Sequence, residues 1–143
     1  MEWVGTRSGT PNTADWGRFE WSESWPLGVT VVDAVKVLTS AAGLAQWLDE
    51  VIAFDSRRGG RIELGTATDN YRASYSLIDP PRRVVLSTER HGELAFDFDE
   101  RGNEAVLRLT VTRLVRPSED EPTVVASLQR VIDNLRGITS SGR

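Results

Sequence analysis

The chain has 143 residues, of which 39% are hydrophobic, so it is long enough for one domain that buries a substantial core. Its 17 Lys and Arg residues against 21 Asp and Glu residues give a net charge of -4, which argues against nucleic acid as a partner. The chain contains no Cys and a single His, which excludes disulfides, thiolate chemistry and an ordinary zinc site, and we expect no cofactor.

The N-terminal segment predicts an irregular arm. Residues 1–17 are rich in Gly, Thr, Pro and Asn. They lack the basic start and apolar run of a signal peptide, and no segment approaches the ~20 apolar residues of a membrane span. We therefore expect a cytoplasmic protein with the arm, one domain over 18–137 and a polar tail over 138–143. A homodimer formed through the arm and its Trp3 is an alternative that the sequence leaves open.

Residues 18–25 predict a half-buried strand, because polar and apolar side chains alternate along them. Phe19, Trp21 and Trp25 fall on one face of this strand, and Glu23 falls on the same face. A buried carboxylate needs a partner or a raised pKa. Glu23 is therefore either a polar anchor in a cavity or a residue that strand twist or a bulge carries to the rim.

Two short helices are predicted after this strand. Thr30, with Asp33 three residues later, has the spacing of an N-cap for the first helix, and Ser40 can cap the second. Leu44 and Trp47 supply the buried side of the second helix.

The middle of the chain predicts six strands, because polar and apolar residues alternate between turn signals. The expected strands form a hairpin over 51–64 that turns at Gly59-Gly60, followed by segments over 71–77, 84–88, 93–98 and 104–112. Breaks are expected at Pro80-Pro81, at His91-Gly92 and at Arg101-Gly102-Asn103.

A long amphipathic helix is predicted near the end of the chain, over residues 122–135. Pro122 suits its first position, and Gly137 suits its stop. The apolar residues recur at helical spacing and need a partner surface: Val124, Val125, Leu128, Val131, Ile132 and Leu135. The simplest architecture is a curved sheet packed against this helix.

This order of elements resembles the helix-grip (START-like, SRPBCC) superfamily, and within it the bacterial homologues of the activator of heat shock protein 90 ATPase. The resemblance is carried by LTSAAGLAQWL over 38–48, FDSRRGGRIEL over 54–64 and IDPPRRVVLST over 78–88, and it covers about residues 18–137. It implies an α+β fold in which an antiparallel sheet of about seven strands grips the C-terminal helix. It also implies a cavity between them, which holds an apolar small molecule in many relatives.

The predicted cavity is lined by residues that alternate in phase along neighbouring strands, with two helix residues as its lid. Tyr71 and Tyr75 would add hydroxyls to an otherwise apolar wall, or they serve only in core packing. The candidate ligand-binding residues are Trp21, Glu23, Tyr71, Tyr75, Phe96, Phe98, Leu107 and Leu109, with Val124 and Leu128 above them. Such a wall suits an apolar or amphipathic ligand.

Other polar residues give weaker signals. His91 would have to serve any Ser-His-Asp triad, but its place beside Gly92 favours an exposed turn. Arg57, Arg58 and Arg61 flank a Gly-Gly turn that could present amides to an anion, although a solvated hairpin tip explains them better. We predict no metal site and no catalytic residue.

Three functions remain open from the sequence. The first is binding of a small hydrophobic ligand. The second is an enzyme of the polyketide cyclase or dehydratase kind, since the same fold hosts both, although fold analogy alone does not establish catalysis. The third is contact with a chaperone, as the name of the resembling family suggests.

Overall fold

The computed structural model describes residues 3–7, 17–101 and 104–140. Within these ranges the elements are β1 (Trp3–Arg7), β2 (Gly17–Pro26), α1 (Val31–Thr39), α2 (Ala41–Trp47), β3 (Val51–Phe54), β4 (Ile62–Gly65), β5 (Asn70–Asp79), β6 (Arg83–Thr88), β7 (Gly92–Arg101), β8 (Glu104–Val115) and α3 (Glu121–Ser140). The expected turn at Arg101-Gly102-Asn103 lies partly outside the described residues.

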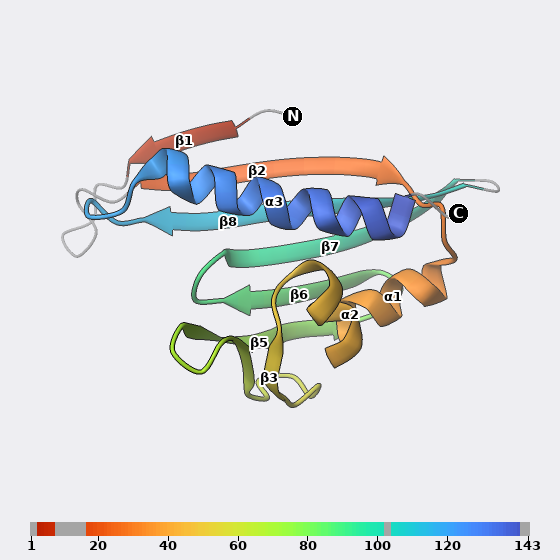
Figure 1. Ribbon diagram of the computed structural model, residues 1–143. Helices are drawn as coiled ribbons and strands as arrows, with labels where there is room; N and C mark the ends of the chain where they lie inside the picture. Colours follow the sequence, from red (N-terminus) through yellow and green to blue (C-terminus); the bar gives the residue numbers. More distant parts are fainter. Residues whose placement is uncertain (1–2, 8–16, 102–103, 141–143) are drawn as a thin grey trace.

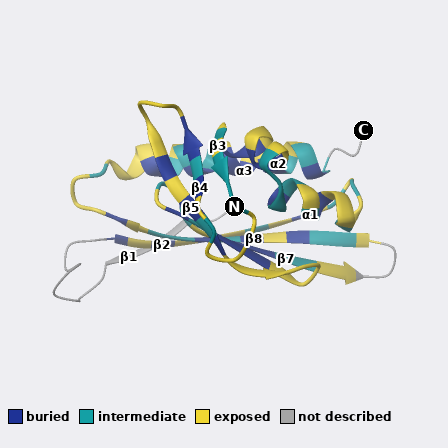
Figure 2. Ribbon diagram, turned by 90° about the horizontal axis from the view of Figure 1, so that it is seen from below, coloured by how far each residue is buried: buried dark blue, intermediate teal, exposed yellow. Residues whose placement is uncertain are grey.

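The strands form one antiparallel sheet in the order β1-β2-β8-β7-β6-β5-β4-β3. α3 lies over β2 and β8, and α1 and α2 lie over the β5 side of the sheet (Figure 1). Figure 2 shows all three helices on the same side of the sheet, with β3 and β4 rising beside them. This curved sheet around a long C-terminal helix confirms the predicted α+β helix-grip fold.

β1 corrects the expectation of an irregular arm. The described part of that arm, Trp3–Arg7, pairs antiparallel with β2 from Trp3 opposite Trp21 to Arg7 opposite Gly17. Without it, β2 would be an edge strand with unpaired backbone N–H and C=O groups. The described sheet therefore has eight strands, where about seven were expected. The division into arm, domain and tail stays a prediction.

The core lies between the sheet and the helices. The predicted stripe of α3 faces it, since Val124, Leu128, Val131, Ile132 and Leu135 are all buried. Both predicted N-caps of the short helices are also confirmed. The Asp33 N–H donates to Thr30 Oγ1 over 3.1 Å, and the Gly43 N–H donates to Ser40 Oγ over 3.0 Å. None of the described helices is both long and apolar enough to cross a membrane.

The predicted helix stop at Gly137 is wrong, because α3 continues to Ser140. A mid-helix glycine costs about 1 kcal/mol relative to alanine, and tertiary contacts of the next turn offset that cost. Thr139 is fully buried, and its carbonyl accepts a hydrogen bond from the Gly28 N–H over 2.8 Å. The Thr139 hydroxyl accepts from Trp25 Nε1 over 2.8 Å and donates to the Leu135 carbonyl over 2.8 Å.

Thr139→Val should lower the free energy of unfolding by about 1–3 kcal/mol, because it leaves the buried Trp25 N–H without its acceptor while keeping the side-chain shape. Urea denaturation followed by circular dichroism measures the change. Ser140→Ala removes a hydroxyl that bonds only within the helix and is the matched control, with a change of about 0.5 kcal/mol or less. Equal changes for the two variants would show that the link to β2 does not hold the end of α3.

Candidate functional site

The predicted lining residues meet in the interior between the sheet and α3. Eight of them belong to one buried apolar cluster: Trp21, Tyr71, Tyr75, Phe96, Leu107, Leu109, Val124 and Leu128. Phe98 is half-buried and packs against this cluster. The members from β2, β8 and β7 share one face because the register across these three strands is continuous. That they bind a ligand stays a prediction.

Glu23 is the one predicted lining residue outside that cluster. Its side chain is 18% exposed and forms an ion pair with Arg136 of α3. The Arg136 guanidinium also lies over the Trp25 ring, 5.4 Å from its centroid. β2 pairs with β8 in continuous register from Gly17 to Pro26, so no bulge moves Glu23 toward the rim. Glu23 links β2 to α3 on the side of the interior away from Tyr71.

The two tyrosines differ in what their hydroxyls do. Tyr75 donates to the Leu38 carbonyl over 2.6 Å and so ties β5 to the end of α1. Tyr71 donates to Asp49 Oδ2 over 2.8 Å, in the segment that links α2 to β3. Burial, followed by the hydrogen bond to the Asp49 carboxylate, raises the pKa of Tyr71. Tyr71 is therefore a neutral phenol held by a carboxylate at the edge of the apolar interior.

The prediction that His91 occupies an exposed turn is wrong, because its side chain is only 1% exposed. The turn folds inward, since Thr88 Oγ1 accepts from the His91 N–H over 2.8 Å and donates to the Gly92 carbonyl over 3.1 Å. Gly92 adopts a φ of 79°, which a larger residue would resist. The imidazole packs edge-on against Tyr71 with the ring centroids 5.6 Å apart. Turn chemistry alone could not show which way the ring would point.

The His91 imidazole is neutral, and its Nε2 atom lacks a hydrogen-bond partner among the described residues. Burial lowers the pKa of His91 to about 4, against the opposing effect of Asp49. The positive charges of Arg90, Arg113 and Arg130 lower this pKa further. Its Nε2 atom is buried and has no hydrogen-bond partner among the described residues. Buried polar atoms in folded proteins nearly always have a partner, so this nitrogen marks a place for a further polar atom.

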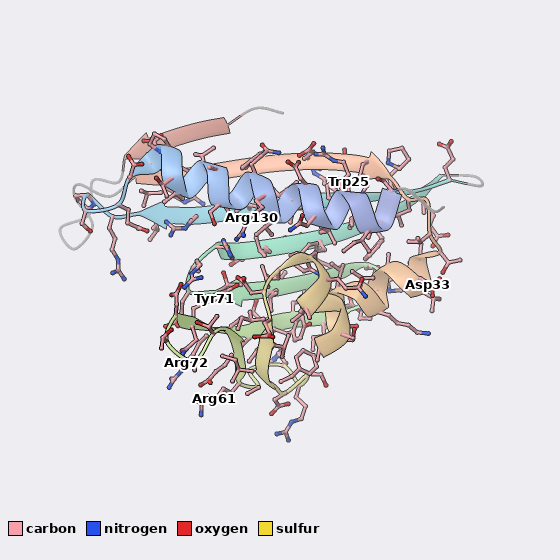
Figure 3. All side chains as sticks on the ribbon, viewed as in Figure 1. Trp25, Asp33, Arg61, Tyr71, Arg72 and Arg130 are labelled. Carbon is pink, nitrogen blue, oxygen red and sulfur yellow. The ribbon has the colours of Figure 1, made fainter. Side chains whose placement is uncertain are left out.

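Three guanidinium groups surround this end of the interior, and two of them have partners. Arg90 pairs with Asp69 over 2.6 Å and lies over the Tyr71 ring, 4.4 Å from its centroid. Arg113 donates to the Arg90 carbonyl over 2.8 Å and pairs with Glu119 over 2.8 Å. The third, Arg130, comes from α3 (Figure 3), is exposed to solvent and forms no ion pair within the described part of the chain.

A groove of about 620 Å³ opens beside this group of polar residues. Tyr71, Arg90, Arg113 and Glu119 contribute to its walls, whereas His91, Asp49 and Arg130 do not line it. We call Tyr71, Asp49 and His91 the polar end from here on. Of these residues the sequence indicated Tyr71 as a site residue, assigned His91 to an exposed turn and gave no signal for Asp49. The period-2 pattern gives no information on residues in turns or in the segment between α2 and β3, where His91 and Asp49 lie.

Two of the three arginines at the Gly-Gly turn are paired with neighbouring carboxylates. Arg57 pairs with Asp55 over 2.8 Å, and Arg61 pairs with Glu63. Arg58 is exposed. These contacts match the solvated hairpin tip that the sequence favoured. No group of three or more His, Cys, Asp or Glu residues that could hold a metal ion occurs within the described ranges.

Comparison with solved structures identifies the same fold in several bacterial proteins. The chain is similar to the Aha1 dimer from Colwellia psychrerythraea, with 13% identity, a TM-score of 0.66, and coverage of 87% of this chain and 98% of that one. It is also similar to protein BH1534 from Bacillus halodurans, with 13% identity, a TM-score of 0.66, and coverage of 85% and 96%. CalU16 from Micromonospora echinospora gives 19% identity, a TM-score of 0.61, and coverage of 99% and 84%.

At such low identities these structures establish the fold alone. A comparison with curated proteins found no match. The profile of one protein family, described as activator of Hsp90 ATPase homolog 1-like protein, matches residues 29–139 and so spans α1 to the last turn of α3. Together with the fold, this match places the chain in the helix-grip superfamily, as a member of the activator of Hsp90 ATPase homolog 1-like family.

Proposed function

We propose that the protein binds a small apolar or amphipathic molecule between the concave face of the sheet and α3, and that it does so in the cytoplasm. The observation that carries the proposal is the buried Nε2 atom of His91, which has no protein partner among the described residues. It lies at the polar end of an otherwise apolar interior. A ligand atom at that position would satisfy it.

Entry of a ligand requires movement, because the lining side chains are buried in mutual contact. The short α2 and the long α3 pack against each other above β7 and β6, and they would have to separate at the polar end. We therefore expect association slower than the ordinary 10⁵–10⁷ M⁻¹s⁻¹ range.

Leu109→Trp tests this location by filling the interior. Leu109 is fully buried on β8, so the larger side chain should weaken uptake of an apolar fluorescent probe more than tenfold while helix and sheet content stay unchanged. Fluorescence titration measures the uptake, and circular dichroism checks the fold. If the crowded core fails to fold, Phe98→Trp adds volume at a half-buried position of the same wall.

Leu77→Trp is the matched control, since Leu77 is 37% exposed, lies on β5 and takes no part in the apolar cluster. It should bind the probe as the wild-type protein does. Equal binding of the probe by the wild-type protein, the Leu77→Trp control and the interior variant would contradict an interior site. No uptake of the probe by the wild-type protein would contradict ligand binding itself.

An acid-base enzyme of the polyketide cyclase or dehydratase kind is the second candidate. It is favoured by the Tyr71 phenol on the Asp49 carboxylate, beside a neutral imidazole. The two functions differ in the fate of the bound compound. A binding protein releases it unchanged, whereas an enzyme releases a product of different mass.

The comparisons supply two proposals about partners. The Colwellia psychrerythraea relative is described as a dimer, so the first proposal is that this chain forms a homodimer. The family's description supports contact with a chaperone as the other. Analytical ultracentrifugation tests the first, and a pull-down against the chaperone tests the second.

A further inference from the structure

The polar end leaves one buried hydrogen-bonding atom unused. The His91 side chain is 1% exposed, and its Nε2 atom has no hydrogen-bond partner among the described residues. The ring stands edge-on to Tyr71, with the ring centroids 5.6 Å apart, and the Tyr71 hydroxyl is already donated to Asp49. The atom that this end offers to a further group is therefore His91 Nε2.

The turn that carries His91 is held without the imidazole nitrogens. Thr88 Oγ1 accepts from the His91 main-chain N–H over 2.8 Å and donates to the Gly92 carbonyl over 3.1 Å. An apolar ring of similar size would fill the same space without burying an unpaired polar atom. Such a departure from the rule that buried polar atoms are paired is typical of a functional site.

The surroundings of Nε2 disfavour a charged partner of either sign. Asp49 is half-buried and forms no ion pair within the described part of the chain, so its negative charge opposes an anion. A cation would lose its hydration on burial. It would also meet the Arg90 guanidinium, which lies 4.4 Å from the centroid of the Tyr71 ring. The group that fits beside Nε2 is therefore neutral.

A hydroxyl is the neutral group that matches this nitrogen best. In a neutral imidazole one nitrogen donates and the other accepts, and a hydroxyl can pair with Nε2 in either role. It can also turn its proton toward the negative charge of Asp49. An ether or carbonyl oxygen only accepts, so it would present its own partial negative charge to that carboxylate.

We propose that the ligand is a neutral alcohol or phenol with an apolar body, whose hydroxyl forms a hydrogen bond with His91 Nε2 while the body lies against the apolar cluster under α3. This assignment rests on the proposed function and adds the chemical class of the ligand.

The first experiment compares three fluorescent probes that differ only at one end. They are a long-chain alcohol that carries an anthroyloxy fluorophore, its methyl ether and the corresponding carboxylic acid. In fluorescence titrations at pH 7 the wild-type protein should bind the alcohol about tenfold more tightly than the ether, because the ether has no proton to donate. The acid should bind more weakly than the alcohol, because its charge meets that of Asp49.

His91→Phe keeps a ring against Tyr71 and should reduce the preference for the alcohol over the ether to about twofold or less. Thr139→Val is the matched control, because it removes a buried hydroxyl that bonds Trp25 near the C-terminal end of β2. It should keep the preference of the wild-type protein. Circular dichroism checks the fold of both variants.

A second measurement does not depend on any variant. His91 is the only histidine of the chain, so its ring gives the only imidazole signals in the ¹⁵N NMR spectrum of the tag-free protein. The Nε2 signal should move further with saturating alcohol than with saturating ether.

Equal affinities for alcohol and ether, tighter binding of the acid, or an Nε2 signal that does not respond to the alcohol would overturn the hydroxyl assignment while ligand binding stands. Failure of all three probes to bind the wild-type protein would overturn ligand binding and this assignment together.

Discussion

Leu128→Asp is expected to unfold the domain. Leu128 is 1% exposed at the middle of the α3 stripe and belongs to the central apolar cluster. Replacing it removes about 2–5 kcal/mol of packing and burial, and the buried carboxylate finds no partner in an apolar surrounding. A domain of this size is stable by only about 5–15 kcal/mol, so most or all of its free energy of unfolding is lost.

Circular dichroism and urea denaturation measure this effect. Ala126→Asp is the matched control on the same helix, because Ala126 is exposed. Its cost should stay near the difference in helix propensity, about 0.7 kcal/mol. A Leu128→Asp protein that melts like the wild-type protein would show that α3 does not hold the core.

His91 should make the domain less stable as the pH falls from about 6.5 toward 4. Burial lowers the pKa of His91 from 6.5 to about 4, so the unfolded chain binds a proton in this window that the folded protein does not. The full contribution is present above pH 6.5 and is lost as the pH falls. The loss is about 2 kcal/mol between pH 7 and pH 5, and about 3 kcal/mol below pH 4.

Urea denaturation of the wild-type protein and of His91→Phe at a series of pH values measures this window. The groups that face the ring are Tyr71, Asp49, Arg90, Arg113 and Arg130, and all of them remain in the variant. The phenylalanine ring can pack against Tyr71 but cannot take up a proton. Parallel stability curves for the two proteins between pH 7 and pH 5 would contradict a buried neutral His91.

Periodicity in the sequence was enough to predict the layers of the fold. The α3 stripe from Val124 to Leu135 could only be buried against a partner surface, and the structure places it on the sheet. The N-caps at Thr30 and Ser40 are local and depend on side chains three residues apart, so they also followed from the sequence.

Features that depend on tertiary contacts were missed. β1 forms because β2 offers an open edge, which no local pattern near Trp3–Arg7 reveals. α3 passes Gly137 because Thr139 is held by Trp25, more than a hundred residues away in the chain. The polar end joins a turn, a strand and an inter-element segment, so its members share no sequence period.

Native mass spectrometry of the freshly purified protein tests ligand binding most directly. The account predicts a population heavier than the bare chain by one small molecule, which denaturation releases and which extracts into organic solvent. The Leu109→Trp protein should carry less of it, and the Leu77→Trp protein as much as the wild-type protein. A wild-type protein that shows only the mass of the bare chain, both as purified and after incubation with the apolar fluorescent probe, would contradict the account.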